Sequence, residues 1–314
     1  MNLFSEFVWI FIQFALFLIV SPFIQGIIKK TKARLQSRKG PSIWQGYYDL
    51  KKYFHKSIVL SEDASWITKI TPYVVFTAIG LSSILVVTFF YSPTRGEIGD
   101  ILVIIYLFTL ARFFLTLVGL DAGSSFGGMG SSRELAVSAL AEPAFILAVF
   151  TYVYPLKVTS FDEVVRQLNS SNIEWLNPTI LFSFLALFII LLTETGRIPV
   201  DNPDTHLELT MIHEGMLLEF TGRHLALMTW AQWIKQMILL SIIASFFFPY
   251  ISFNYTFLGI FTSFIIYFAK IIGLAILLGV VETALAKMRF YRIPRLLGMS
   301  MILSIFTFLS QYVI

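Results

Sequence analysis

Ionisable side chains are sparse in this chain, and the stretch from Glu194 to His224 concentrates them. Charged residues make up 13% of the 314 residues, yet this stretch carries three of the four histidines among several carboxylates. Imidazole and carboxyl groups hold and release protons, and carboxylates that share a site of low dielectric constant cannot all ionise at once. The stretch is therefore a candidate for proton chemistry.

Charged residues also interrupt otherwise apolar runs. Lys270 and Arg112 lie in the middle of such runs, Glu142 lies beside Pro143, and Glu282 ends a run. A charge in the middle of a membrane span costs about 2.5–3.5 kcal/mol, which makes it a functional candidate by default. Because Pro143 frees a backbone carbonyl, Glu142 is the strongest candidate for a buried titrating group. The alternatives are structural: Arg112 and Lys270 paired with carboxylates, and Glu282 reaching the membrane interface.

Several familiar enzyme sites are excluded by the sequence. The chain has no cysteine, so it has no thiolate for an iron–sulfur cluster, a Cys-based zinc site or a catalytic thiol. His213-Glu214 begins like a zinc-binding HExxH motif, but Leu217 stands where the second His belongs. His206 lies about 10 Å from His213 along a helix, too far to share a metal. The glycines at 127–130 lack the strand and the Gly-Lys-Ser/Thr of a phosphate loop, so we predict a tight turn there.

The composition is that of a membrane protein. Hydrophobic residues make up 57% of the chain, and the mean hydropathy is +0.78. These values exclude a soluble enzyme, a disordered chain and a secreted disulfide scaffold. A transmembrane helix needs about 20 mainly apolar residues, and such runs occur at roughly 7–28, 70–91, 100–120, 135–155, 178–194, 234–252, 255–281 and 296–313. We predict an all-α polytopic membrane protein with about eight transmembrane helices, forming a single domain over 1–314.

The distribution of Lys and Arg predicts the orientation of these spans. An even number of spans places both termini on one side of the membrane. The loops on that side carry only Arg95, Lys157 and Arg166, whereas most other basic residues lie in the alternate loops. By the positive-inside rule, both termini are external and the loops at 29–66, 120–134, 194–233 and 282–296 are cytoplasmic. The first run has no basic residues before it, so it is a retained span rather than a signal peptide.

The cytoplasmic loops contain two helix patterns. Aromatic residues and Leu recur at 44, 47, 50 and 54, a helical spacing. One interpretation is an amphipathic helix in the interface or under a docked partner, and the other is a basic segment that only sets topology. Further on, 205–208 matches a capping box, which predicts a helix beginning at Thr205. On that helix Glu208 and Glu219 share one face, and His206 and His213 share the opposite face.

Five motifs, in order along the chain, resemble the subunit 1 (NuoH-like) family of respiratory complex I. The resemblance covers essentially the whole chain and rests on Arg38-Lys-Gly-Pro41, Arg133-Glu134 with Ala141-Glu142, Glu194-Thr-Gly-Arg-Ile-Pro-Val-Asp201, Glu219-Phe-Thr-Gly222, and the basic loop from Arg289 through Pro294-Arg295. Two positions depart from that family. Gly196 stands where the signature has Asn, and Ala141 stands where Tyr precedes the buried Glu, which puts a quinone chamber in doubt.

Other departures resemble the hydrogenase branch of the same family. The run from Asn202 to Glu214 and the later 222–227 are similar to formate hydrogenlyase subunit 4 and to the membrane subunit of energy-converting [NiFe] hydrogenases. The resemblance implies a membrane anchor for a peripheral redox arm, with hydrogenase large and small subunits and an Fe–S subunit as partners. It also implies antiporter-like membrane partners. The NiFe centre and the Fe–S clusters are then expected in those partner subunits, with no cofactor in this chain, and no nucleic acid is involved. The implied location is the plasma membrane of a prokaryote.

Two sets of residues carry the implied function. We predict a buried acidic relay that runs from the redox arm toward the membrane partners. Its members are Glu142, Glu194, Asp201, Glu208, Glu214, Glu219, Lys270 and Glu282. For any single acid the alternative is a local role, such as a helix cap or a salt bridge. The predicted docking contacts for the redox arm are Arg34, Arg38, Arg197, Arg223, His206, His213, Arg289 and Arg295.

Two other functions compete with the ion-coupling anchor. The first is the quinone-site subunit of a true NADH dehydrogenase of the complex I type. The second is a stand-alone secondary transporter, which would show two related halves with broken helices. The sequence has no such internal symmetry.

Overall fold

The computed structural model describes residues 3–62, 64–89, 99–170, 178–202, 210–250 and 257–313, and these residues are mainly helical. The longer helices are α1 (Leu3–Leu35), α3 (Trp66–Leu85), α5 (Ile101–Asp121), α6 (Ser125–Leu156), α8 (Pro178–Glu194), α10 (Gly222–Phe247), α11 (Phe257–Ala284) and α12 (Ile293–Val313). The shorter ones are α2 (Gln45–His55), α7 (Phe161–Ser170), α9 (His213–Leu217) and the 3-10 turn η1 (Phe290–Arg292). No strand longer than an isolated bridge occurs in the described ranges.

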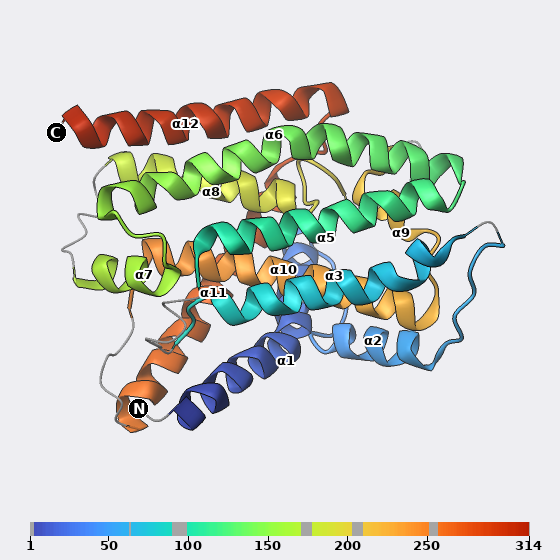
Figure 1. Ribbon diagram of the computed structural model, residues 1–314, viewed down its shortest axis with the longest axis horizontal. Helices are drawn as coiled ribbons and strands as arrows, with labels where there is room; N and C mark the ends of the chain where they lie inside the picture. The colour runs from blue at the N-terminus through green and yellow to red at the C-terminus, as the bar shows by residue number, and fades with distance from the viewer. Residues whose placement is uncertain are drawn as a thin grey trace.

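Each of the eight apolar runs corresponds to one helix. Seven helices in the described residues are long and apolar enough to cross a membrane, and α8, with 17 residues, is a shorter apolar helix. The prediction of an all-α polytopic membrane protein is confirmed. Most of the long helices run back and forth along one direction, whereas α1 and α11 cross them obliquely, and both ends of the chain lie at the same end of the bundle, together with α7 (Figure 1). Helices α2 and α9 lie at the opposite end (Figure 1).

The glycines at 127–130 are not the predicted turn, because they lie in the first turns of α6. The chain turns earlier, at Gly123, which has a φ of +65°, and Ser124 caps α6 by accepting a hydrogen bond from the Gly127 amide. A Cβ at Gly127 would lie 2.6 Å from the Gly119 carbonyl oxygen on α5. Glycine is therefore required here for the close approach of two helices, and the predicted loop at 120–134 is mostly helix.

The loop predicted at 194–233 is shorter than expected. Helix α10 begins at Gly222, and of the long helix predicted from Thr205 through Glu219 only the five residues of α9 are helical within 210–219. The start of that helix, with His206 and Glu208, lies outside the described residues. The polar residues at the beginning of α10 resemble a loop in the sequence. They are tolerated in a helix because α10 is the most buried of the spans and packs against protein rather than lipid.

The basic loops at 29–66 and 282–296 also contain helix. Helix α1 continues to Leu35 and α12 begins at Ile293. The amphipathic helix predicted from position 44 is confirmed as α2, and its residues Leu50, Tyr53 and Phe54 pack against α10. Helix α2 therefore lies against protein on its apolar face. The short helix α7 was not predicted.

A proline in α1 is accommodated by neighbouring aromatic residues. Pro22 has no amide hydrogen, so the Leu18 carbonyl one turn earlier loses its helical donor. The indole Nε1 of Trp230 on α10 donates to that carbonyl over 3.0 Å, and the Tyr47 hydroxyl on α2 donates to the adjacent Ile19 carbonyl. These two bonds hold α1, α2 and α10 together at the end of the bundle where the ionic residues gather.

Candidate functional site

Three charged side chains at and just after the end of α8 point to three different parts of the bundle. Gly196, with a φ of +57°, ends the helix, and the Arg197 amide donates back to the Leu192 carbonyl over 2.9 Å, the pattern of a Schellman motif. Glu194 before this reversal, and Arg197 and Asp201 after it, each enter a separate ionic cluster. Asn also tolerates a left-handed backbone, so Gly in place of Asn preserves this reversal of the chain.

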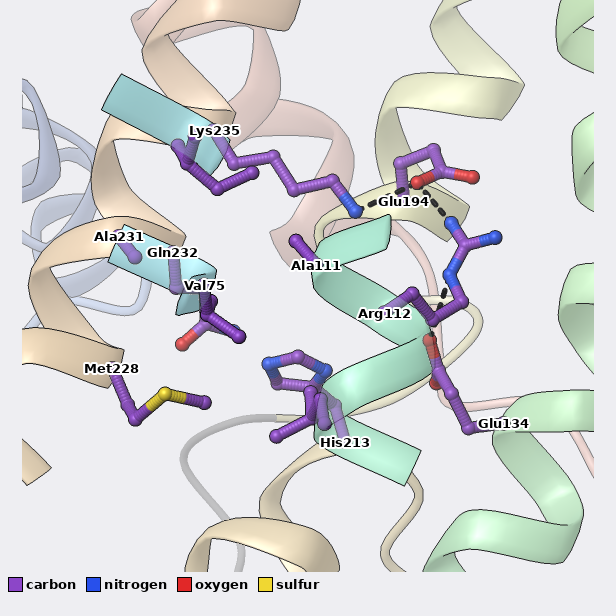
Figure 2. Close-up of a pocket in the computed structure, with 12 residues that line it drawn as sticks. Val75, Ala111, Arg112, Glu134, Glu194, His213, Met228, Ala231, Gln232 and Lys235 are labelled. Carbon is purple, nitrogen blue, oxygen red and sulfur yellow. Dashed lines mark hydrogen bonds and ion pairs between the residues drawn. The ribbon is translucent and has the colours of Figure 1, made fainter. Parts of the chain in front are cut away.

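Arg112 on α5 is the centre of the first cluster, which we call the Arg112 network. Its guanidinium forms ion pairs with Glu142 at 2.8 Å, with Glu134 at 3.4 Å, and with Glu194. Lys235 on α10 reaches the same Glu194 carboxylate at 2.7 Å (Figure 2). The network contains three carboxylates and two cations, so a fully ionised cluster carries one net negative charge. This arrangement confirms the structural alternative for Arg112, which is paired with carboxylates.

The packing of α5 and α6 sets the geometry of the network. Glu134 and Glu142 are eight residues apart on α6, which places them on nearly the same face. The Ser131 hydroxyl donates to the Thr116 carbonyl over 3.0 Å, and together with the Gly119–Gly127 contact it holds the two helices close. The Arg112 side chain therefore lies between the two glutamates rather than in lipid.

Burial differs sharply within the network. The Glu194 side chain is 1% exposed and that of Arg112 is 7% exposed, whereas that of Glu142 is 31% exposed. Glu194 is thus enclosed between two cations, and Glu142 is the member that reaches the surface of the bundle. A charge-assisted pair in the interior is strongly held because removing either partner leaves an uncompensated buried charge.

A small cavity of about 40 Å³ adjoins the Arg112 network. Its polar lining comes from Arg112, Glu134, Glu194, His213, Gln232 and Lys235, and apolar residues such as Met228 form the rest (Figure 2). A polar cavity of this size has room for water molecules, which need only about 10–15 Å³ of such space each. Water here would connect His213 on α9 with the ion pairs on α5 and α8.

Arg197 is the centre of a second buried cluster. It donates to Glu282 over 3.2 Å, to Gln25 over 2.6 Å and to Gln236 over 2.8 Å. Lys32 forms an ion pair with Glu282 at 2.8 Å. The cluster joins α1, α10 and α11 to the loop after α8. Arg197 is only 5% exposed and Glu282 only 2%, so in this chain both side chains are held inside the bundle by each other and by their other partners. The docking role of Arg197 stays a prediction.

Asp201 belongs to a third cluster at the start of α9. Its carboxylate accepts hydrogen bonds from the Ile212 amide at 3.0 Å and the His213 amide at 3.3 Å, and it forms an ion pair with Lys287 at 2.7 Å. Carboxylates stabilise helix starts because the amides there lack partners. Asp201 therefore fixes the position of His213 beside the cavity.

Two predicted relay acids lie next to these clusters without an ion pair among the described residues. Glu214 is half-buried on α9, and burial raises the pKa of its carboxyl group. The nearby Asp201 charge raises this pKa further, whereas His213, Arg197 and Lys29 lower it. Glu219 is half-buried in the turn after α9. Glu208 lies outside the described residues.

Lys270 lies apart from the acidic residues. Its ammonium group donates to the Phe248 carbonyl and, over 3.4 Å, to the Tyr250 carbonyl, just beyond the end of α10. No carboxylate of the described residues forms an ion pair with it, so the alternative of a carboxylate partner in this chain is not met there, and its place in the relay stays a prediction. Lys270 instead satisfies carbonyls at a helix C-terminus.

The remaining docking candidates are on the surface. Arg34, Arg38, Arg223, Arg289 and Arg295 are exposed. His213 is half-buried and lines the cavity rather than the surface, and His206 lies outside the described residues.

The sequence did not identify several members of the clusters. Lys235 was assigned to the edge of a loop, because the span was thought to begin at 234. In the structure Lys235 lies in the middle of α10, which is continuous from Gly222, so the correct start of this helix would have identified Lys235 as an intramembrane cation. Nor did the sequence predict the ion pairs of Lys32 with Glu282 and of Lys287 with Asp201. Among the described residues there is no group of three or more His, Asp or Glu side chains that could hold a metal ion.

Comparison with known proteins gives one family. The model of the NADH dehydrogenase family matches residues 8–312. Hydrogenase-4 component C of Escherichia coli K12 is 32% identical over 88% of this chain and 87% of its own length. Formate hydrogenlyase subunit 4 of the same organism is 28% identical over 91% of this chain and 92% of its own. A chain in the solved structure of an archaeal membrane-bound sulfane sulfur reductase superposes with a TM-score of 0.80 at 18% identity, over 96% of this chain and 99% of that one.

Proposed function

Because this chain belongs to the NADH dehydrogenase family of membrane subunits, we propose that it is the membrane anchor and ion-coupling subunit of a [NiFe]-hydrogenase-type respiratory complex. It links the chemistry of a peripheral redox arm to the movement of protons or sodium ions. It has no redox centre of its own, since a chain without cysteine cannot ligate an Fe–S cluster through thiolates. The NiFe centre and the Fe–S clusters belong to partner subunits.

The hydrogenase branch is preferred to the quinone-site alternative for two reasons. The relatives named as hydrogenase-4 and formate hydrogenlyase subunits align over nearly the whole chain, whereas a chain 1 of NADH-ubiquinone oxidoreductase from Dictyostelium citrinum is 26% identical over 70% of it. The cavity beside Arg112 is about 40 Å³, while pockets for organic ligands are usually about 300–1,000 Å³. It suits water and protons better than a quinone ring.

The observation that carries the proposal is the Arg112 network. Three carboxylates share one guanidinium inside membrane-spanning helices, next to a polar cavity. Because these carboxylates share one cation, a change of charge or conformation at one of them changes how the guanidinium pairs with the others. Glu142, the most exposed member, is the exchange point, and Glu194 is the fixed anion that keeps Arg112 and Lys235 in place.

The redox arm and the membrane partners bind at different places. The side of the bundle with α2 and α9 faces the cytoplasm, and both termini are external, in the plasma membrane of a prokaryote. The hydrogenase large and small subunits and the Fe–S subunit dock on that side, where Arg34, Arg223, Arg289 and Arg295 are exposed. The antiporter-like subunits contact the membrane-embedded surface.

Ion uptake into inverted vesicles tests the proposal. Glu142→Gln in the assembled complex should lower the ratio of ions moved to electrons transferred toward zero, while electron transfer to an artificial carrier continues. Glu163→Gln is the matched control, since Glu163 lies on α7 at the other end of the bundle and pairs only with near neighbours. An unchanged ratio in Glu142→Gln would remove the Arg112 network from the coupling path.

A further inference from the structure

A basic pocket of about 640 Å³ lies between the end of α1 and the loop after α8. Its cationic lining is Lys29, Lys32 and Arg38, and apolar lining comes from Ala33, Pro41 and Ile198. Nothing in the proposed ion-coupling function requires this pocket. Its volume and charge are those of a site for an anionic group with an apolar attachment.

The pocket is shaped by the reversal of the chain after α1. Lys29, Lys32 and Ala33 lie on one face of the helix because they are three and four residues apart. The Arg38 amide donates to the Ala33 carbonyl over 2.7 Å, and Gly40, at a φ of +66°, passes so close to Ala33 that a Cβ would lie 2.4 Å from its methyl group. This turn brings Arg38 back over the two lysines.

The pocket keeps an excess of positive charge. Lys32 is paired with Glu282, but no ion pair of the described residues involves Lys29 or Arg38. Lys29 also interacts electrostatically with Glu214, so three convergent cations face two carboxylates of the described residues. Bringing like charges together is unfavourable, and an anion bound between Lys29 and Arg38 would relieve the repulsion.

The depth of the pocket fits the headgroup layer of a membrane. The apolar part of α1 runs from Val8 to Ile28, about 30 Å at 1.5 Å per residue, which is long enough to cross most of the hydrocarbon layer although α1 is inclined to the other long helices (Figure 1). Lys29 and Lys32 follow immediately, where phosphate groups lie. Trp44 and Tyr48 at the same end of the bundle are 55% and 62% exposed, as expected for aromatic residues at the membrane interface.

We propose that this pocket binds the phosphate of an anionic phospholipid headgroup in the leaflet that faces the redox arm. The phosphate oxygens accept hydrogen bonds from Lys29 and Arg38, and the acyl chains leave along the apolar side of α1. A bound lipid would then lie beside the Arg197 cluster through Lys32 and stabilise the junction of α1 with α11.

The test uses the intact complex, purified in detergent and stripped of loosely bound lipid. It is titrated with phosphatidylglycerol or phosphatidylcholine, and bound lipid is counted by native mass spectrometry, with inorganic phosphate as a competitor. Phosphatidylglycerol should bind more tightly than phosphatidylcholine. Each basic residue removed should weaken phosphatidylglycerol binding about fivefold. Lys29→Gln alone should therefore weaken it about fivefold, and Lys29→Gln with Arg38→Gln about 25-fold.

Lys51→Gln with Lys52→Gln is the matched control, since it removes two exposed charges from α2 at the same end of the bundle but outside the pocket. An equal loss of phosphatidylglycerol affinity in the control and in the pocket variants would show that the pocket is not the lipid site. Inorganic phosphate that displaces the lipid at similar concentrations would make it a site for a free anion instead. Release of the soluble subunits from the pocket variants, with lipid binding unchanged, would assign the pocket to an acidic partner.

Discussion

Arg112 and Lys270 are both cations in the middle of membrane-spanning helices, yet their surroundings are opposite. Arg112 is enclosed by Glu134, Glu142 and Glu194 on two neighbouring helices. Lys270 donates to the backbone carbonyls of Phe248 and Tyr250 and has no carboxylate partner among the described residues. Each cation has partners that compensate for its loss of hydration. The partners of Arg112 are carboxylates, which can bind a proton, whereas those of Lys270 are backbone carbonyls, which cannot.

The difference shows that an intramembrane charge is not by itself a sign of ion coupling. A cation that satisfies carbonyls at a helix end has a fixed partner whose charge never changes. A cation shared by several carboxylates has partners whose proton occupancy depends on each other. The number of titratable partners, rather than the cost of burying the charge, separates a candidate relay residue from a structural one.

The largest expected effect is that of Arg112→Leu. It leaves three carboxylates without their shared cation, and breaking a buried ion pair by removing one partner costs about 3–5 kcal/mol. We expect little assembled complex in the membrane, measured by quantitative blotting. Arg112→Lys should restore part of the assembly, because an ammonium carries the charge but lacks the planar fork of guanidinium. Normal assembly of Arg112→Leu would show that the carboxylates are held by other groups.

A smaller effect is expected for Lys235→Met. Glu194 loses one of its two cations but keeps Arg112, so the loss should be about 1–3 kcal/mol, as for one charged hydrogen bond. The complex should assemble but unfold at a lower temperature in detergent, with Gln232→Met on the same helix as a control for the change in side chain. A variant as unstable as Arg112→Leu would mean that Lys235, not Arg112, holds Glu194.

Lys270→Met should have a smaller effect still. Helix-end carbonyls are worth about 0.3–1 kcal/mol to a nearby cation, and the side chain is partly exposed. Assembly and the ion-to-electron ratio should both stay close to those of the wild type in inverted vesicles. A large fall in the ratio would show that Lys270 takes part in ion coupling, and the proposed difference between Lys270 and Arg112 would then be wrong.

The smallest effects concern two carboxylates outside the spans, whose pKa values move in opposite directions. Burial raises the pKa of Glu214, so its ionised form destabilises the fold and the penalty grows as pH rises through the folded-state pKa. The Arg166 hydrogen bond lowers the pKa of Glu163, so its stabilisation is present above the unfolded pKa and disappears as pH falls.

Thermal unfolding of the two Gln variants across pH checks these signs. Glu214→Gln should become more stable relative to the wild type as pH rises from acidic values. Glu163→Gln should become less stable relative to the wild type over the same change. A common direction for both variants would contradict the assignment of burial to one carboxyl group and ion pairing to the other.

Apolar periodicity predicted the spans well, because a membrane helix must be continuous and apolar to avoid exposing its backbone. The errors occur where helices are buried in protein. The first turns of α6 contain three glycines and three serines, of which Gly127 and Ser131 contact α5. Helix α10 begins with polar residues and carries Lys235, which pairs with Glu194 at the end of α8. Hydropathy treats both segments as loops because it cannot distinguish a lipid neighbour from a protein neighbour.

The sequence by itself determined the class of the protein, the approximate positions of the spans, the shared side of the two termini and the identity of the charged residues. It also contained the Glu194–Asp201 motif, which pointed to the right part of the chain. It did not determine which acid meets which base. Arg112 and Glu194 are 82 residues apart, and Arg197 and Glu282 are 85 apart, so only the packing of helices decided these pairs. The physical reason is that ion pairing depends on distances of a few ångströms between helices, whereas span formation depends on composition along one helix.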